Sequence, residues 1–176
     1  LANGLVALLD AAVVLRERKR DDIVLELIGD GKMKPALQAR CDKENLANCR
    51  FVDPMPKQEL AERLGEVDAG LMILADVPAF YQGTSPNKFF DYLASGLPIV
   101  INYPGWMAEL VDTNQCGVTV VPGAAEALAD ARCQLADDSR LKMQMGNNAR
   151  ALAENSFNRE QLAKKFISFL ERVCDE

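Results

Sequence analysis

Short apolar runs alternate along the chain with longer segments in which apolar residues recur every three or four positions. Short apolar runs bounded by turn residues are typical of buried strands, whereas the three-and-four spacing is typical of amphipathic helices. The first such helix is predicted over residues 5–20, directly behind Asn3 and Gly4. Strands are then predicted at 23–28, 50–52, 69–74, 98–102 and 118–121, and helices at 33–44, 56–64, 86–94, 106–111 and, as two or three segments, from 124 onward.

The predicted strands are apolar throughout rather than at every second position. Strands of this kind, alternating with helices, indicate a parallel sheet that is covered by helices on both faces. The expected fold class is therefore α/β, a doubly wound, Rossmann-like sheet, in one domain over residues 1–176. Because the first strand of such a sheet normally precedes the first helix, we expect that strand upstream of Leu1. Ligands lie beyond the carboxyl ends of these strands, so the loops after residues 28, 52, 74 and 102 form the candidate binding rim.

Composition narrows the function classes. With 176 residues, of which 49% are hydrophobic and 26% charged, the chain can bury the core of one compact domain. The net charge of −6 argues against nucleic-acid binding, which depends on an excess of Lys and Arg. No apolar run approaches the roughly 18 residues that cross a membrane, and the five scattered cysteines are typical of reduced thiols, so we expect a soluble cytosolic protein.

Histidine is absent from the chain, which removes the commonest general base and metal ligand. A Ser-His-Asp or Cys-His catalytic site is therefore excluded. No clustered acidic motif indicates a magnesium site either, so we expect neither a metal nor another cofactor.

Segment 83–96 has the most informative pattern of the chain. Ser85 suits the N-cap of a helix, Pro86 its first position and Gly96 its C-terminal stop. The buried face of this helix is predicted to consist of Phe89, Phe90, Leu93 and Ala94, and its polar face of Lys88, Asp91 and Ser95.

Lys88 lies in the first turn of this predicted helix, where a cation is disfavoured. The free N–H groups of a helix N-terminus attract phosphate, and a cation there opposes the macrodipole by a few tenths to about 1 kcal/mol. A bound diphosphate would remove this cost. The alternative is a solvated pair between Lys88 and Asp91, three residues apart, and the spacing alone favours neither.

The stretch GTSPNKFFDYLASGLPIV, residues 83–100, resembles the donor-site segment of family-four, GT-B-fold glycosyltransferases of bacterial surface-polysaccharide assembly. The resemblance continues through LIGDG, CRFVDPMPKQELAERLGEVDAGLMIL, MAELVDTNQCGVTVVPG and MGNNARALAENSFNRE, and so covers nearly the whole chain. It implies that the chain is the C-terminal, donor-binding half of such an enzyme. An N-terminal domain of the same polypeptide would then bind the acceptor across a cleft.

Two acidic positions of the family, separated by seven residues, fall on Gly83 and Asp91. The resemblance implies that Asp91 binds the ribose hydroxyls of the donor. The first acid contacts the donor sugar or the nearby phosphate, and Gly83 has no side chain for this contact. The family also carries Lys-Gly where this chain has Asn3 and Gly4, so one phosphate-binding cation is absent and Lys88 is the candidate to replace it.

The remaining site residues follow from the resemblance together with the pattern of helices and loops. The diphosphate would lie against Ser85, Asn87 and Lys88, and the nucleobase against a loop that contains Val52, Pro54 and Met55. Gly83, Thr84 and Tyr81 would lie near the donor sugar, although Tyr81 and its neighbour Phe80 could equally pack in the core. The turn at residues 29–31 could approach the ligand or serve only as a connection, and we expect Trp106 to pack at the start of a helix.

The expected function is transfer of a hexosyl unit with retention of configuration, without a metal, from a UDP-linked or similar sugar to a lipid-linked or saccharide acceptor. The product would be a cell-surface polysaccharide of the lipopolysaccharide type. We expect the chain alone to bind donor without catalysing transfer, in the cytoplasm or at the inner face of the membrane through the upstream domain. The alternatives are one half of a sugar-nucleotide epimerase and a nucleotide-binding or interaction module without chemistry.

Overall fold

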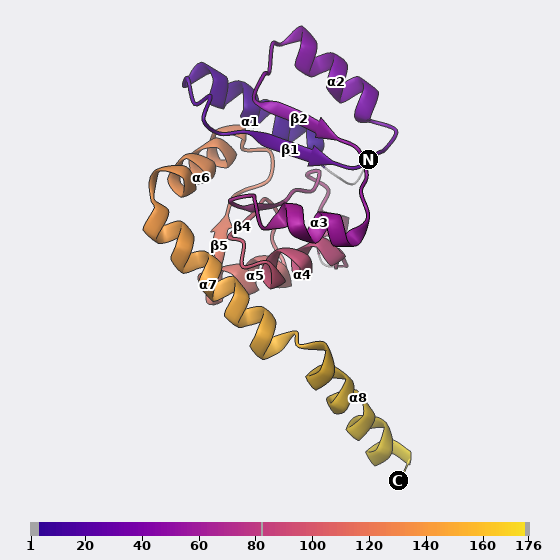
Figure 1. Ribbon diagram of the computed structural model, residues 1–176. Coiled ribbons are helices and arrows are strands. Elements are labelled where there is room, and N and C mark those ends of the chain that lie inside the picture. The colour runs from indigo at the N-terminus through magenta and orange to yellow at the C-terminus, as the bar shows by residue number, and fades with distance from the viewer. Residues whose placement is uncertain (1–3, 82, 175–176) are drawn as a thin grey trace.

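The computed structural model describes residues 4–81 and 83–174 (Figure 1). Helices and strands alternate through the first two thirds of the chain, and helices alone make up the rest. In chain order the elements are α1 (Leu5–Glu17), β1 (Leu25–Ile28), α2 (Lys34–Lys43), β2 (Cys49–Val52), α3 (Lys57–Leu64), β3 (Gly70–Met72), the 3-10 helix η1 (Pro78–Phe80), α4 (Asn87–Ala94), β4 (Ile99–Ile101), α5 (Trp106–Thr113), β5 (Gly117–Thr119), α6 (Ala125–Asp137), α7 (Ser139–Ser156) and α8 (Arg159–Cys174).

All strand pairs are parallel, as predicted. β1 pairs with β2, with Leu25 opposite Cys49, and β4 lies between β3 and β5, with Ile99 opposite both Gly70 and Gly117. The strands form two hydrogen-bonded sheets, in the orders β1-β2 and β3-β4-β5. Within the described residues, β1 and β3 therefore each pair with a strand along one edge only.

Two clusters of buried side chains cover the two faces of the strands. β4 shows the alternation, because Val100 faces one cluster whereas Ile99 and Ile101 face the other, and all three are fully buried. This is the two-sided burial that the apolar strand sequences predict. The first cluster includes Leu8, Leu9, Leu25, Leu37, Ile73, Val100, Leu128 and Leu135, from α1, α2 and α6 and from both sheets. The second includes Met72, Phe89, Leu93, Ile99, Ile101, Met107, Val111 and Leu152, from α4, α5 and α7 and from one sheet.

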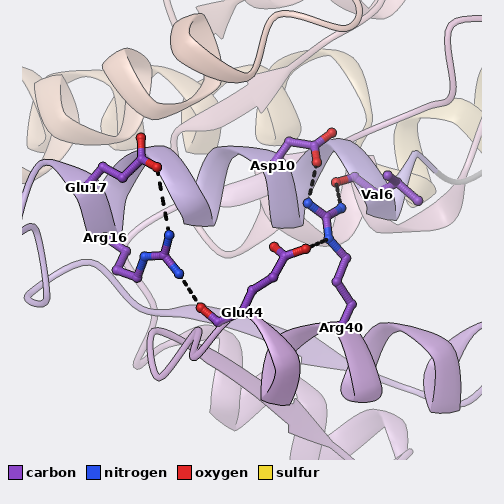
Figure 2. A network of polar contacts seen from close by, with 6 residues as sticks. All are labelled: Val6, Asp10, Arg16, Glu17, Arg40 and Glu44. Carbon is purple, nitrogen blue, oxygen red and sulfur yellow. Dashed lines mark hydrogen bonds and ion pairs between the residues drawn. The ribbon is translucent and has the colours of Figure 1, made fainter.

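Helix α2 is attached to α1 largely by polar contacts, since only Leu37 and Cys41 of α2 are buried. Figure 2 shows the network. Arg40 lies between two carboxylates, at 2.6 Å from Asp10 Oδ1 and 2.9 Å from Glu44 Oε1. Arg16 of α1 donates a hydrogen bond to the Glu44 carbonyl. The network therefore fixes both the end of α2 and its position on α1.

Helix α8 extends away from the rest of the molecule (Figure 1). Every residue of α8 up to position 173 whose exposure is described is exposed to solvent. Its large apolar side chains are exposed as well, namely Leu162, Phe166, Ile167, Phe169, Leu170 and Val173.

Candidate functional site

The carboxyl ends of β3 and β4 are joined by one buried amide side chain. Asn102, only 1% exposed, accepts a hydrogen bond from the Leu74 N–H at 2.8 Å through Oδ1 and donates one to the Leu74 carbonyl at 3.0 Å through Nδ2. Both bonds are enclosed, where an unsatisfied amide would be costly. The loops that follow these strands therefore start from fixed positions on the predicted rim.

A lysine joins the loops at the carboxyl ends of β1 and β2. Lys34 Nζ donates to the Gly29 carbonyl at 3.1 Å and lies 2.7 Å from Asp53 Oδ1. The ammonium group lowers the pKa of Asp53. Gly29 has φ near +134°, a conformation that favours glycine. The turn at residues 29–31 and the predicted nucleobase loop, with Val52, Pro54 and Met55, are thus held beside each other.

Helix α4 begins one residue later than predicted. Pro86 has ψ near 137° and is the N-cap, so Ser85 lies outside the helix, is exposed and makes no capping hydrogen bond. The reason is that the Pro86 carbonyl accepts the Phe89 N–H at 3.1 Å, which closes the first turn from position 86. Asn87 and Lys88 are then the first two helical residues, and their N–H groups have no acceptor within the helix.

The end of α4 and most of its buried face agree with the prediction. Gly96 has φ near +66°, the left-handed conformation typical of a residue that follows a helix. Phe89 and Leu93 are fully buried and Phe90 is partly buried, but Ala94 is exposed, contrary to the prediction. Tyr92 belongs to the packed side of α4 instead of Ala94, because the Tyr92 ring lies against Gly70 of β3 and so faces the sheet. The short last turn leaves Ala94 on the outer side.

Trp106 packs at the start of α5, as predicted. Its ring lies 5.9 Å from Phe89 and 6.4 Å from Phe90, measured between centroids. Phe90 in turn contacts Phe157, which follows α7, at 5.1 Å. This aromatic cluster fixes α4 against two other helices and thereby sets the direction in which the α4 N-terminus points.

Lys88 and Asp91 do not form the ion pair that was the alternative interpretation of their spacing. Asp91 Oδ1 instead lies 3.5 Å from Nζ of Lys57, the first residue of α3, whose side chain is 84% exposed. Lys88 is half-buried, and this burial lowers its pKa. Over residues 4–81 and 83–174, no ion pair to Lys88 is found. Lys57 was not predicted from the sequence as a site residue, although a cation at a helix start is as unfavourable there as at Lys88.

The connection between β3 and α4 is folded back on itself. The Tyr81 hydroxyl donates a 2.5 Å hydrogen bond to Asp76 Oδ1, and the Thr84 hydroxyl donates to the Phe80 carbonyl. Tyr81 is 9% exposed and stacks on Tyr103 at 6.3 Å, so the core-packing alternative holds for its ring. Phe80 is exposed instead. The bond to Asp76 and burial together raise the pKa of Tyr81 to about 12.

Gly83 and Gly4 lie in contrasting surroundings. Gly83 is exposed, and a Cβ atom added there would meet nothing within 4 Å. Gly4 is buried, and a Cβ atom there would collide with the carbonyl oxygen of Leu74. The start of α1 therefore lies directly against the end of β3, on the same rim. Asn3, the other residue predicted near the phosphates, lies outside the described residues.

The described residues contain no cluster of three or more Cys, Asp or Glu side chains that could hold a metal ion. In the same part of the chain, no helix is long and apolar enough to cross a membrane.

Comparison with known proteins gives the family of the chain. The family described as "Glycosyl transferases group 1" matches residues 2–138. A curated relative, the amylovoran biosynthesis glycosyltransferase AmsK of Erwinia amylovora, is 27% identical over 150 residues, which are 84% of this chain and 37% of that protein. The chain thus spans little more than a third of this relative.

Solved structures show the same fold. The C-terminal domain of LpcC, a glycosyl transferase group 1 family protein from Francisella tularensis, has a TM-score of 0.73 at 19% identity and covers 90% of this chain and 81% of its own. Anabaena Alr3699/HepE in complex with UDP has a TM-score of 0.74 at 20% identity, over 94% of this chain and 45% of its own. Given the family match over most of its length, the chain belongs to the glycosyl transferases group 1 family and has the fold of one half of a GT-B glycosyltransferase.

Proposed function

We propose that the chain is the donor-binding half of a glycosyltransferase and binds a nucleotide-diphosphate sugar at the carboxyl rim of its strands. The observation that carries the proposal is Lys88. It is a half-buried cation in the first turn of α4, beside free N–H groups and without an ion-pair partner in the described part of the chain. Burial disfavours the charged form of an unpaired lysine, and the positive end of a helix repels a cation. A bound diphosphate would bring negative charge to both the ammonium group and the helix N-terminus, which would make this arrangement favourable.

The rest of the site is arranged around this diphosphate position. Ser85, exposed just before α4, and the N–H groups of Asn87 and Lys88 would bind phosphate oxygens. Asp91, one turn further along α4, would accept hydrogen bonds from the ribose hydroxyls, since two carboxylate oxygens can receive two vicinal hydroxyls. Lys57 would move from Asp91 to the ligand.

The nucleobase and the sugar would lie at opposite ends of the ligand. The loop with Val52, Pro54 and Met55 directly precedes Lys57, the partner of Asp91, which supports a base position beside the ribose. Gly83, Thr84 and Tyr81 belong to the connection that enters α4, which supports a sugar position beside the phosphates. A UDP-sugar is the donor that we propose, because Alr3699/HepE, which shares the fold, forms a complex with UDP.

Such a site promotes transfer by stabilising the departing nucleotide diphosphate. Fixed N–H groups and a cation act most strongly where water is excluded and where negative charge develops on the leaving group. Lys88 and the start of α4 provide these groups without a metal. Family resemblance supports hexosyl transfer with retention of configuration.

A further part of the proposal is that residues upstream of this chain complete the sheet and supply the acceptor-binding domain. β1 and β3 each have one edge without a strand partner in the described residues, and Gly4 places the start of α1 against the end of β3. A parallel strand that leads into Gly4 would lie between these edges and join the two sheets. The curated relative is long enough to include such a strand and a second domain.

The acceptor that we propose is a lipid-linked or saccharide chain in the assembly of a cell-surface polysaccharide. Amylovoran biosynthesis by the relative AmsK supports this class of product. We propose that the enzyme acts in the cytoplasm or at the inner face of the membrane, with the upstream domain making the membrane contact.

Titration calorimetry with UDP, GDP and UDP-sugars tests the donor site. Lys88→Ala should weaken UDP binding by about 1.5–3 kcal/mol, the usual contribution of a hydrogen bond to a charged group. The matched control is Lys142→Ala, which removes the same charge from α7, where Lys142 pairs with Asp68 at 2.5 Å. Equal affinities of the two variants for UDP would contradict the proposal.

A second candidate function, a nucleotide-binding module without chemistry, is favoured by Gly83, where the family's first acid has no counterpart. The two functions differ in how the donor sugar is bound. A module without chemistry should bind UDP and UDP-sugars equally well, whereas a transferase half should distinguish them.

A further inference from the structure

We propose that Asp76 takes over the donor-sugar contact that Gly83 cannot make, and that Tyr81 positions Asp76 for this role. The inference rests on the proposed donor site and names the group that would recognise the sugar. Asp76 was not singled out by the sequence, because no motif includes it. Its surroundings in the fold suggest the role.

Asp76 lies where a ligand of a doubly wound sheet is expected. It comes two residues after Leu74, whose backbone is fixed by Asn102 on one side and lies against Gly4 on the other. Within the described residues, β3 is an edge strand of the β3-β4-β5 sheet. Ligands of parallel α/β sheets bind beyond the carboxyl ends of the strands.

The carboxylate of Asp76 is held in place yet has free capacity to bind. One oxygen, Oδ1, accepts the 2.5 Å hydrogen bond from the Tyr81 hydroxyl. Tyr81 is itself fixed, because its ring is buried and stacked on Tyr103. Asp76 is exposed, so Oδ2 and the second lone pair of Oδ1 remain available. A carboxylate fixed in this way can accept hydrogen bonds from two neighbouring hydroxyl groups.

Charge decides which part of the donor faces Asp76. A carboxylate repels a diphosphate and attracts sugar hydroxyls, which are donors. The phosphates therefore belong at Lys88 and the α4 N-terminus, and the hexose belongs at Asp76, at the other end of the connection between β3 and α4. Gly83, which lies between Asp76 and Lys88 in the sequence, is exposed, and a Cβ atom added there would meet nothing within 4 Å.

The test compares UDP with UDP-glucose, UDP-galactose and UDP-N-acetylglucosamine by titration calorimetry on the 176-residue chain. Asp76→Asn keeps the shape and can still accept from Tyr81, but it replaces a carboxylate oxygen with an NH₂ donor. We expect about tenfold or greater loss of affinity for the UDP-sugar that wild type binds best and no change for UDP. Asp68→Asn, which removes the same charge beside Lys142, should change neither.

Two further variants separate positioning from binding. Tyr81→Phe removes the hydroxyl but keeps the ring in the core, so it should reduce the preference among the three sugars while leaving UDP affinity unchanged. Gly83→Glu restores the acid of the family at a position with open space, and in the Asp76→Asn background it should recover UDP-sugar affinity. Thermal unfolding of each variant shows whether it is folded.

Each outcome bears on a different claim. If wild type binds UDP, but Asp76→Asn lowers the affinities for UDP and UDP-sugars equally or lowers neither, the role of Asp76 is overturned while the donor site stands. If wild type binds the three sugars no differently from UDP, Asp76 recognises no sugar. If wild type does not bind UDP at all, the donor site itself is wrong and the role of Asp76 falls with it.

Discussion

Two lysines of the proposed donor site occupy unfavourable positions. Lys57 is the first residue of α3 and Lys88 the second residue of α4, so both cations lie at helix N-termini, where the macrodipole disfavours them. Asp91 relieves one of them through its 3.5 Å contact with Lys57. A nucleotide diphosphate would bring phosphate to the lysines and ribose hydroxyls to Asp91. Each of the three side chains would then have a partner of suitable charge.

The Asp91→Asn variant tests the binding of the ribose separately from the binding of the phosphates. The amide has one acceptor oxygen and places an NH₂ donor where a hydroxyl also donates, so UDP should bind about 1.5–3 kcal/mol more weakly. Inorganic diphosphate, which has no ribose, should bind almost unchanged. Calorimetric titration of both ligands against both proteins measures the difference.

Equal losses for UDP and diphosphate would contradict this assignment. Asp91 would then be an electrostatic partner of Lys57, and another group would bind the ribose.

The sequence predicted the places of residues on α4 better than their contacts. Asn87, Lys88 and Asp91 could be placed on α4 because the start and end of this helix are encoded locally, by Pro86 and Gly96. The contact between Lys57 and Asp91 and the bond from Tyr81 to Asp76 depend on how the chain folds back. No spacing rule connects residues 57 and 91, since their distance is set by the tertiary fold. Ser85 was misplaced because Pro86 can cap a helix as well as start one.

At the scale of elements, the sequence predicted the types of the helices and strands and the parallel direction of the strands well, but the ends of the strands less well. β4 could be identified as a buried parallel strand because Ile99, Val100 and Ile101 are all apolar, as a strand covered on both faces requires. The carboxyl ends of β3 and β5 were each predicted two residues too long, because apolar residues continue beyond the last paired residue. Leu74, for example, is buried but bonds to the Asn102 side chain rather than to a strand. The division into two sheets could not be foreseen from apolar patterns, which do not state which strands are neighbours.

Helix α2 provides a pH-dependent test at this scale, because its contact with α1 is mainly ionic (Figure 2). Arg40 lowers the pKa of Glu44. A carboxyl group whose pKa is lower in the folded state stabilises the fold above its unfolded pKa, about 4.3, and loses this contribution as the pH falls through the lowered folded value. Glu44→Gln should therefore be less stable than wild type at neutral pH, and the difference should vanish in acid.

Urea denaturation at a series of pH values measures this difference. Glu154→Gln is the matched control, because Glu154 pairs with Arg150 in the same i,i+4 geometry on α7, where both side chains are more than half exposed. A stability difference between Glu44→Gln and wild type that stays constant from neutral pH to acid would show that Glu44 acts through packing rather than charge.

At the scale of the whole molecule, shared core packing joins the two sheets, whereas α8 extends from the rest. One core cluster joins side chains of both sheets beneath α1 and α6, so the described part holds together although β1 and β3 are not paired with each other. By contrast, α8 exposes a row of apolar side chains that includes Phe166 and Phe169. Relatives of the family are much longer than this chain, as AmsK shows.

The chain alone should therefore bind a UDP-sugar without transferring the sugar. The groups that we propose to bind the diphosphate, Lys88 and the start of α4, belong to this half and should suffice for binding. Transfer also requires an acceptor hydroxyl held close to the anomeric carbon, and such positioning accounts for several kcal/mol of a typical enzymatic rate enhancement. Incubation with radiolabelled UDP-sugars and a bacterial lipid and saccharide extract, followed by measurement of labelled product and released UDP, tests this expectation. Label transfer that saturates with donor and is lost in Lys88→Ala would contradict it, because that result would place a working acceptor site within these 176 residues. Binding without transfer, restored to transfer in a longer protein that includes an upstream domain, is the outcome that the division into donor and acceptor halves predicts.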